Sequence, residues 1–170
     1  MNILSKPAEK AIDCLRHEGF EAYAVGGFTR DMIMGRPDND TDITTSALPE
    51  EIKKVFSDFR TVDTGIKHGT VTVIIEDTPL EITTYRIEKG YSDGRHPDEV
   101  IFTRNLTEDL KRRDFTVNSI AYCPKEGFVD PFGGREDIKR KIIRSPCWIF
   151  CRSRRSPDSP VVFITRHRSI

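Results

Sequence analysis

Two aspartates separated by one residue, Asp40 and Asp42, are the side chains in this chain best suited to metal chemistry. On an extended segment, residues i and i+2 project from the same face. Two carboxylates on one face can hold a hard cation such as Mg²⁺, which takes oxygen ligands and keeps positions open for phosphate oxygens. We therefore predict that Asp40 and Asp42 are metal ligands and belong to a catalytic group.

Glu81 is the third member predicted for this catalytic group. It falls in the second strand of an expected hairpin, whose alternating side chains would present it on one face of a sheet. Three carboxylates gathered in one place repel one another unless a cation lies between them, so the cluster itself favours a metal. Glu81 would act either as a third ligand or as the group that orients an attacking hydroxyl.

A pair of glycines, Gly26 and Gly27, precedes the aspartates and predicts a phosphate-binding turn. Glycine has no Cβ, so backbone N–H groups can approach an anion closely. Arg30 follows three residues later, and its planar guanidinium suits phosphate geometry. The alternative for Arg30 is an ion pair with Asp31 or Asp38.

The strongest basic cluster is Lys111-Arg112-Arg113-Asp114. We expect Asp114 to fix the arginines, so that Arg113 faces a nucleotide; the alternative is a solvated, charged helix end. His68 and His96 have no neighbouring nucleophile pattern and do not support a hydrolytic triad. Together these patterns predict transfer of a nucleotidyl group, which depends mostly on positioning and charge neutralisation.

Composition narrows the class of protein. The 170 residues suffice for one domain, and 27 basic residues balance 27 acidic ones, so global charge gives no argument for nucleic-acid binding. No apolar run approaches the roughly 20 residues that span a bilayer, and we expect no membrane partner. The four cysteines show no Cys-x-x-Cys spacing, which favours the reducing cytoplasm.

Periodicity predicts alternating helices and strands along the chain. We expect helices near residues 7–17, 29–34, 49–56, 106–113 and 116–122, strands near 20–25 and 41–45, and a hairpin of 70–75 with 80–85 that turns at Asp77-Thr78-Pro79. Residues 88–99 read as a loop, 130–134 as a turn, and 137–144 as a further helix or strand.

These motifs together resemble the head domain of the tRNA nucleotidyltransferases, the CCA-adding enzymes, which the bacterial poly(A) polymerases share. The resemblance covers about residues 1–144. It rests on Val25-Gly26-Gly27-Phe28-Thr29-Arg30-Asp31, Gly35-Arg36-Pro37, Asp40-Thr41-Asp42-Ile43 and residues 64–73, 81–86, 91–97, 109–118 and 130–134. Thr29 departs mildly from the family, which usually has an aliphatic residue at this position.

The resemblance implies an α+β, polymerase-beta-like nucleotidyltransferase head: a mixed sheet with helices packed on one side. It implies that the 3′-terminal hydroxyl of tRNA attacks the α-phosphate of CTP or ATP, with Mg²⁺ as cofactor and pyrophosphate as leaving group. By position, Asp40 and Asp42 bind the metal and Glu81 is the third carboxylate. The nucleotide contacts implied are Gly26, Gly27, Arg30, Arg112 and Arg113, with Arg113 favoured, and Asp93-Gly94-Arg95 belongs to a loop associated with switching from CTP to ATP.

Residues 145–170 match no part of the family, which continues into a neck domain with a Glu-Asp-x-x-Arg motif. This tail lacks Gly, Ala, Leu, Lys and Glu and is rich in Arg, Ser and Pro. We interpret it as disordered or read out of frame. Two alternatives to CCA addition remain: a poly(A) polymerase or partial CCA-adding enzyme, and an inactive truncated remnant that binds nucleotide without turnover.

Overall fold

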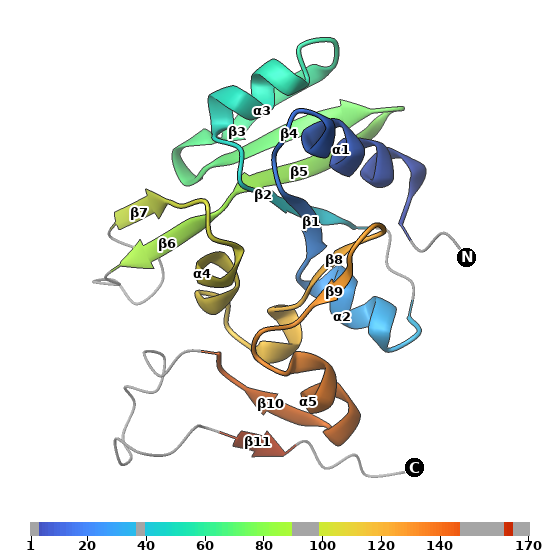
Figure 1. The fold of residues 1–170 in the computed structure, drawn as a ribbon, viewed down its shortest axis with the longest axis vertical. Helices are drawn as coiled ribbons and strands as arrows, with labels where there is room; N and C mark the ends of the chain where they lie inside the picture. Colours follow the sequence, from blue (N-terminus) through green and yellow to red (C-terminus); the bar gives the residue numbers. More distant parts are fainter. Residues whose placement is uncertain (1–3, 37–39, 90–98, 147–161, 165–170) are drawn as a thin grey trace.

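A seven-stranded mixed sheet forms the centre of the computed structural model, which describes residues 4–36, 40–89, 99–146 and 162–164. The strand order is β3-β4-β5-β2-β1-β8-β9 (Figure 1). Its strands are β1 (Ala22–Val25), β2 (Asp42–Thr45), β3 (Arg60–Gly65), β4 (Thr70–Ile75), β5 (Thr78–Thr84), β8 (Ala121–Cys123) and β9 (Gly127–Val129). The pair β2–β5 is parallel and the other neighbours are antiparallel, so the predicted mixed sheet is confirmed.

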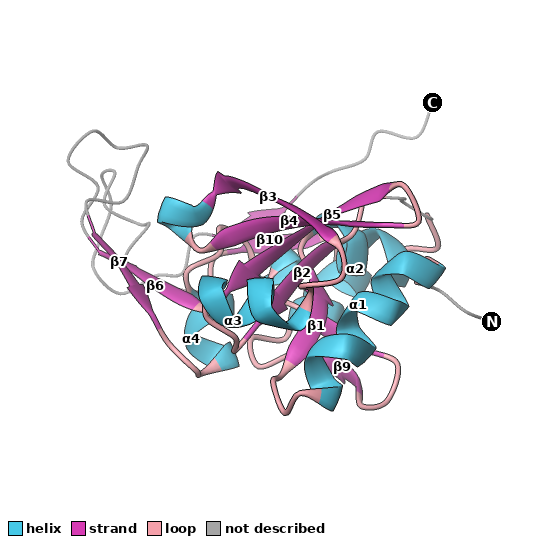
Figure 2. Cartoon of the chain, turned by 90° about the horizontal axis from the view of Figure 1, so that it is seen from above, coloured by secondary structure: helices cyan, strands magenta, loops and turns pink. Residues whose placement is uncertain are grey.

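Helices α1 (Lys6–His17) and α3 (Pro49–Val55) cover one face of this sheet, as Figure 2 shows from above. The α1 helix begins at Ser5, whose hydroxyl accepts from the Ala8 N–H, and it has a proline in its first turn. Its buried residues recur at helical spacing and pack on the strands: Ala8, Ala11, Ile12 and Leu15. Ile52 and Phe56 complete the layer from α3 and its end. This core fixes the strands that carry the candidate site.

The remaining helical elements lie at several places around the sheet. They are α2 (Gly27–Ile33), α4 (Leu106–Lys111), α5 (Gly134–Arg140) and the 3₁₀ turns η1 (Ile66–His68) and η2 (Thr116–Asn118). Two small sheets complete the fold: β6 (Arg86–Lys89) with β7 (Glu99–Phe102), and β10 (Ile142–Arg144) with β11 (Val162–Ile164). In Figure 1 the β6–β7 hairpin extends from the body beside α4.

The structure corrects several predicted elements. Residues 116–122 are not one helix: η2 is a single 3₁₀ turn, and β8 then enters the sheet beside β1. The β4–β5 turn lies at Glu76 and Asp77, both at positive φ, while Thr78 and Pro79 already belong to β5. A two-residue turn with two positive φ values matches the twist of a hairpin, which explains the earlier start of the strand.

Strands β3, β6, β7 and β9 were not predicted, because their sequences are too short or too polar to alternate clearly. Residues 137–144 hold both expected types of element, part of α5 and then β10. In the tail, β11 pairs antiparallel with β10. The rest of the tail from residue 147, and loop residues Asp93-Gly94-Arg95 and His96, lie outside the described residues, so the interpretation of residues 145–170 stays a prediction.

Candidate active site

Asp40 and Asp42 lie on the same side of the chain at the start of β2. Both residues are exposed, whereas Thr41 between them is 4% exposed, as alternation along an extended segment requires. β2 pairs in parallel with β5, with Ile43 opposite Ile82, so the preceding residues Asp42 and Glu81 are neighbours across the pair. The sheet thus brings together the two stretches that carry the three predicted carboxylates.

The electrostatics of Asp42 show that the three carboxylates interact. Burial of the carboxyl group raises the pKa of Asp42, the negative charges of Glu81 and Asp40 raise it further, and Arg113 opposes the shift. Asp42 keeps contact with solvent, but protein atoms crowd its carboxyl group from several sides. Its charged form is therefore held at an energetic disadvantage that a bound cation would relieve.

The fit of a metal to this group follows from the same observation. In the described part of the chain, no three Asp, Glu, His or Cys side chains stand close enough together to hold an ion as they are placed. The set offers carboxylate oxygens alone, which suit Mg²⁺, and the mutual repulsion at Asp42 is what a cation would neutralise. The carboxylates of Asp40 and Asp42 suit the predicted ion by their chemistry, and their role as its ligands stays a prediction.

Gly26 lies beside the Asp42 carboxylate. It has φ +76° and ψ −139°, a backbone conformation that side-chain-bearing residues rarely adopt. A Cβ at Gly26 would lie 3.5 Å from Arg113 Nη1 and 3.6 Å from Asp42 Oδ2. A Cβ at Gly27 would lie 3.5 Å from Arg30 Nη2. Arg113 and Asp42 therefore lie close to the backbone at Gly26, and Arg30 lies close to the backbone at Gly27.

Arg30 adopts the ion pair that was the alternative to phosphate binding. Its Nε and Nη2 donate to the two carboxylate oxygens of Asp31 at 3.0 and 2.7 Å, and Nη1 donates to Asn118 Oδ1 at 2.9 Å. The hydrogen bond from Arg30 lowers the pKa of Asp31. Asp38, the other suggested partner, lies outside the described residues. The pairing still places the guanidinium over Gly27, so a role toward an anion there stays a prediction.

The two arginines after α4 differ in their surroundings. Arg112 Nε donates to Asp109 at 3.0 Å, and its Nη1 donates to Glu88 at 3.0 Å, which ties α4 to β6. Arg113 Nη2 donates to Asp109 at 3.3 Å, while its Nη1 lies toward Gly26. Arg113 is therefore better placed than Arg112 to meet a ligand beside Asp42.

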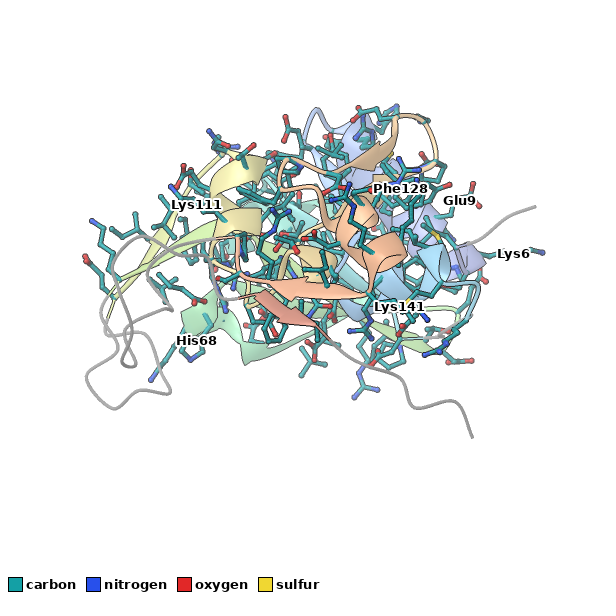
Figure 3. All side chains as sticks on the ribbon, turned by 90° about the horizontal axis from the view of Figure 1, so that it is seen from below. Lys6, Glu9, His68, Lys111, Phe128 and Lys141 are labelled. Atoms are coloured by element: carbon teal, nitrogen blue, oxygen red, sulfur yellow. The ribbon has the colours of Figure 1, made fainter. Side chains whose placement is uncertain are left out.

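Asp114 does not fix the arginines, contrary to expectation. Its carboxylate accepts from the Phe115 N–H and from Asn118 Nδ2. Asp109, one helical turn earlier, binds both guanidinium groups instead. Spacing of three and four residues within a helix could have indicated this role for Asp109. Lys111, labelled in Figure 3, is half-exposed and lies 4.0 Å from Glu108, so it is a surface cation of α4.

Thr29, the departure from the family pattern, has a defined place. It is fully buried, and its hydroxyl lies 2.9 Å from both the Gly26 and Ile120 carbonyl oxygens, to which it can donate. An aliphatic residue would leave these carbonyls without that donor. The hydroxyl thus links the glycine turn to the segment that enters β8.

Comparison with known proteins places this arrangement in a family. The profile of the Poly A polymerase head domain matches residues 22–144, well over half of the chain. The chain belongs to this family. No helix in the described part of this head domain is long and apolar enough to cross a membrane.

Curated relatives of the head domain carry the name CCA-adding enzyme. That of Lactobacillus delbrueckii subsp. bulgaricus is 50% identical over 138 residues, which are 81% of this chain and 34% of the relative. That of Enterococcus faecalis is 51% identical over 140 residues, 82% of this chain and 34% of the relative. The chain therefore spans about a third of the length of these relatives.

Solved structures agree with the sequence comparison. The Bacillus stearothermophilus CCA-adding enzyme in complex with CTP superposes with a TM-score of 0.73 at 45% identity, over 83% of this chain and 33% of that one. A CCA-adding enzyme in complex with ATP gives 0.63 at 25% identity, over the same shares of the two chains. The predicted resemblance and the α+β nucleotidyltransferase head are both confirmed.

Proposed function

We propose that this chain is the catalytic head of a CCA-adding enzyme, which transfers CMP and AMP from CTP and ATP to the 3′ end of tRNA in the cytoplasm. The single observation that carries the proposal is the placement of Asp42 next to Glu81 across the β2–β5 pair, with Gly26 and Arg113 beside it. Relatives about 50% identical bear the name of this activity, and relatives in solved structures bind CTP and ATP.

The carboxylates supply the metal site of the proposed reaction. Asp40 and Asp42 would hold Mg²⁺, which neutralises charge on the triphosphate and polarises the reacting phosphate. Glu81 lies one strand away and is either a further ligand or the acceptor that orients the attacking 3′ hydroxyl. The 3′ hydroxyl would lose its proton as its oxygen forms a bond to the α-phosphorus, while the bond from the α-phosphorus to the pyrophosphate oxygen breaks and pyrophosphate leaves.

The glycine turn and the arginines would bind the phosphates. Gly26 and Gly27 leave room for phosphate oxygens where a Cβ would intrude. Arg113 borders that room and Arg30 lies over it, so both can donate to a triphosphate. Arg112 donates hydrogen bonds to Asp109 and Glu88, so its effect on nucleotide binding would come mainly from holding these two residues in place.

The direct test of this chain is an incorporation assay with Mg²⁺, labelled CTP or ATP, and a tRNA that lacks its 3′ CCA. We expect incorporation of both nucleotides, no incorporation after chelation with EDTA, and recovery when Mg²⁺ is restored. Asp40→Ala should remove incorporation without unfolding the chain. Incorporation that persists in EDTA would contradict the metal assignment. Binding of nucleotide without any incorporation would favour the inactive remnant.

Poly(A) synthesis is the second candidate, because the matching family is described by the poly(A) polymerase head. The length of the product separates the two activities. Extension by a few C and A residues that then stops supports CCA addition, whereas long adenylate tracts made from ATP alone would identify a poly(A) polymerase.

Gly26→Ala is expected to weaken binding of CTP in Mg²⁺ by about tenfold or more, which is about 1.4 kcal/mol. The new Cβ would stand 3.5 Å from Arg113 Nη1, in the space assigned to phosphate. Gly19→Ala is the matched control, because Gly19 also has positive φ (+86°) but meets nothing within 4 Å. Both variants should lose about 1–3 kcal/mol of stability from backbone strain. Equal CTP affinity in the two variants, measured by calorimetry, would argue against the phosphate turn.

A further inference from the structure

Asp109 is a fully buried carboxylate with four hydrogen-bond donors around it. One oxygen accepts from the Arg86 backbone N–H at 3.2 Å and from Arg112 Nε at 3.0 Å. The other accepts from Thr44 Oγ1 at 3.2 Å and from Arg113 Nη2 at 3.3 Å. A carboxylate offers about four acceptor positions, so Asp109 has none left for a metal or a substrate. Any influence it has on the reaction must pass through its partners.

The partners of Asp109 come from three separate elements. Thr44 lies on β2 two residues after Asp42, and residues at this spacing share one face of a strand. Arg86 begins β6, while Arg112 and Arg113 follow α4. A single buried anion therefore ties Arg113 to the strand that carries Asp42. This link fixes how far the guanidinium stands from the carboxylates.

Arg113 is not oriented to satisfy all of its donors within the protein. Its side chain is 16% exposed, and its Nε–H is buried without a hydrogen-bond partner among the described residues. Buried donors are normally paired, so an orientation that leaves one unpaired needs a reason. The Asp109 contact holds Nη2 on one side, and Nη1 then faces the position beside Gly26 and Asp42. The contact with Asp109 therefore orients the Arg113 guanidinium toward Gly26 and Asp42.

We propose that Asp109 is a positioning residue that holds the Arg113 guanidinium beside Gly26 and Asp42, oriented toward the nucleotide phosphates. This inference rests on the proposed function. Asp109 does not touch the reacting atoms. Its charge balances two arginines that would otherwise repel each other in a buried place, and its contact with Thr44 relates them to β2.

The test measures affinity for CTP in Mg²⁺ by calorimetry, at a temperature where circular dichroism shows each variant folded. Asp109→Asn keeps the size of the side chain but replaces one acceptor oxygen by an NH₂ group. This group would face the donors that the oxygen had accepted from, and it cannot accept their hydrogen bonds. We expect at least tenfold weaker binding. Arg113→Ala should have a large effect in the wild-type chain and little further effect in the Asp109→Asn chain. Loss of stability alone does not produce such coupling.

A second pair of variants decides the question if Asp109→Asn does not fold. Thr44→Val removes one of the four donors to Asp109, together with the contact of the same hydroxyl to the Thr83 carbonyl at 3.3 Å, and keeps the shape of the side chain. Thr84→Val is the control: Thr84 is also a fully buried strand residue, and its hydroxyl donates to the Ala47 carbonyl instead. We expect a threefold or greater loss of CTP affinity in Thr44→Val and none in Thr84→Val.

The outcomes separate this inference from the proposed function. If the wild-type chain binds CTP and the folded Asp109→Asn variant binds it equally well, the positioning role is overturned alone. The same holds if Thr44→Val and Thr84→Val have equal affinity. Absence of CTP and ATP binding by the wild-type chain would overturn the proposed function, and this inference with it.

Discussion

Asp42→Asn is expected to lower nucleotide incorporation by at least about 1,000-fold. A metal ligand at a phosphoryl centre contributes several kcal/mol of transition-state stabilisation, and each 1.36 kcal/mol is tenfold in rate. The amide keeps one oxygen but loses the charge that would hold Mg²⁺ between Asp40 and Asp42. Single-turnover incorporation of labelled CTP into tRNA, with excess Mg²⁺, measures the loss.

The same substitution is expected to raise thermal stability at neutral pH. The pKa of Asp42 is raised in the folded chain, by burial first and then by Glu81 and Asp40, so ionisation of Asp42 disfavours folding. Asparagine does not ionise, so the variant does not carry this free-energy cost. Below the unfolded-state pKa of about 3.9, the carboxyl is protonated in both states of the wild type and the difference should vanish. The gain in Tm should therefore appear as pH rises through the pKa of the folded state.

Asp77→Asn is the control for both effects of Asp42→Asn. Asp77 lies in the β4–β5 turn with φ +60°, which asparagine tolerates, and outside the candidate site. Asp77→Asn should keep wild-type incorporation. Its Tm at neutral pH should not rise as the Tm of Asp42→Asn does. Incorporation within tenfold of wild type by Asp42→Asn would remove Asp42 from the metal site. A lower Tm at pH 7 would contradict the repulsion among the carboxylates.

Gly134→Ala is expected to destabilise the chain by about 3 kcal/mol, the upper part of the range for overpacked sites. A Cβ at Gly134 would stand 2.1 Å from the Thr116 carbonyl oxygen and 2.7 Å from its carbon. These are backbone atoms, so α5 must move away from η2. That movement would also disturb the 2.5 Å hydrogen bond that Thr116 Oγ1 donates to the buried Asp137 carboxylate. Thermal unfolding should show a Tm lower by roughly 6–12 °C.

Gly27→Ala is the matched control for stability. Gly27 and Gly134 each begin a seven-residue helix and each follow a glycine with positive φ. At Gly27 the nearest atom to a new Cβ is the end of the Arg30 side chain, at 3.5 Å. Alanine should be neutral or stabilising there, because it favours helix by up to about 1 kcal/mol over glycine. Equal Tm values for the two variants would show that α5 does not pack on η2 as described.

Local pattern predicted the parts of the molecule whose side chains alternate or repeat over several residues. The buried face of α1 and the β4–β5 pair follow from spacing, since burial of apolar side chains on one face is a local property of sequence. By contrast, the expected helix at 116–122 is partly a strand. Ala121 and Tyr122 pair with Val25 and Ala24, and no local signal reveals that neighbour.

The candidate site divides in the same way. The types and spacing of Asp40, Asp42 and the glycine pair predicted the class of chemistry, because few other arrangements suit a hard cation beside phosphate. Only the tertiary structure decided which charges act together. The parallel pairing of β2 with β5 brought Glu81 beside Asp42, and the burial of Asp109 under Thr44 made it, and not Asp114, the partner of Arg113. Electrostatic partners depend on distance and burial, which a sequence does not record.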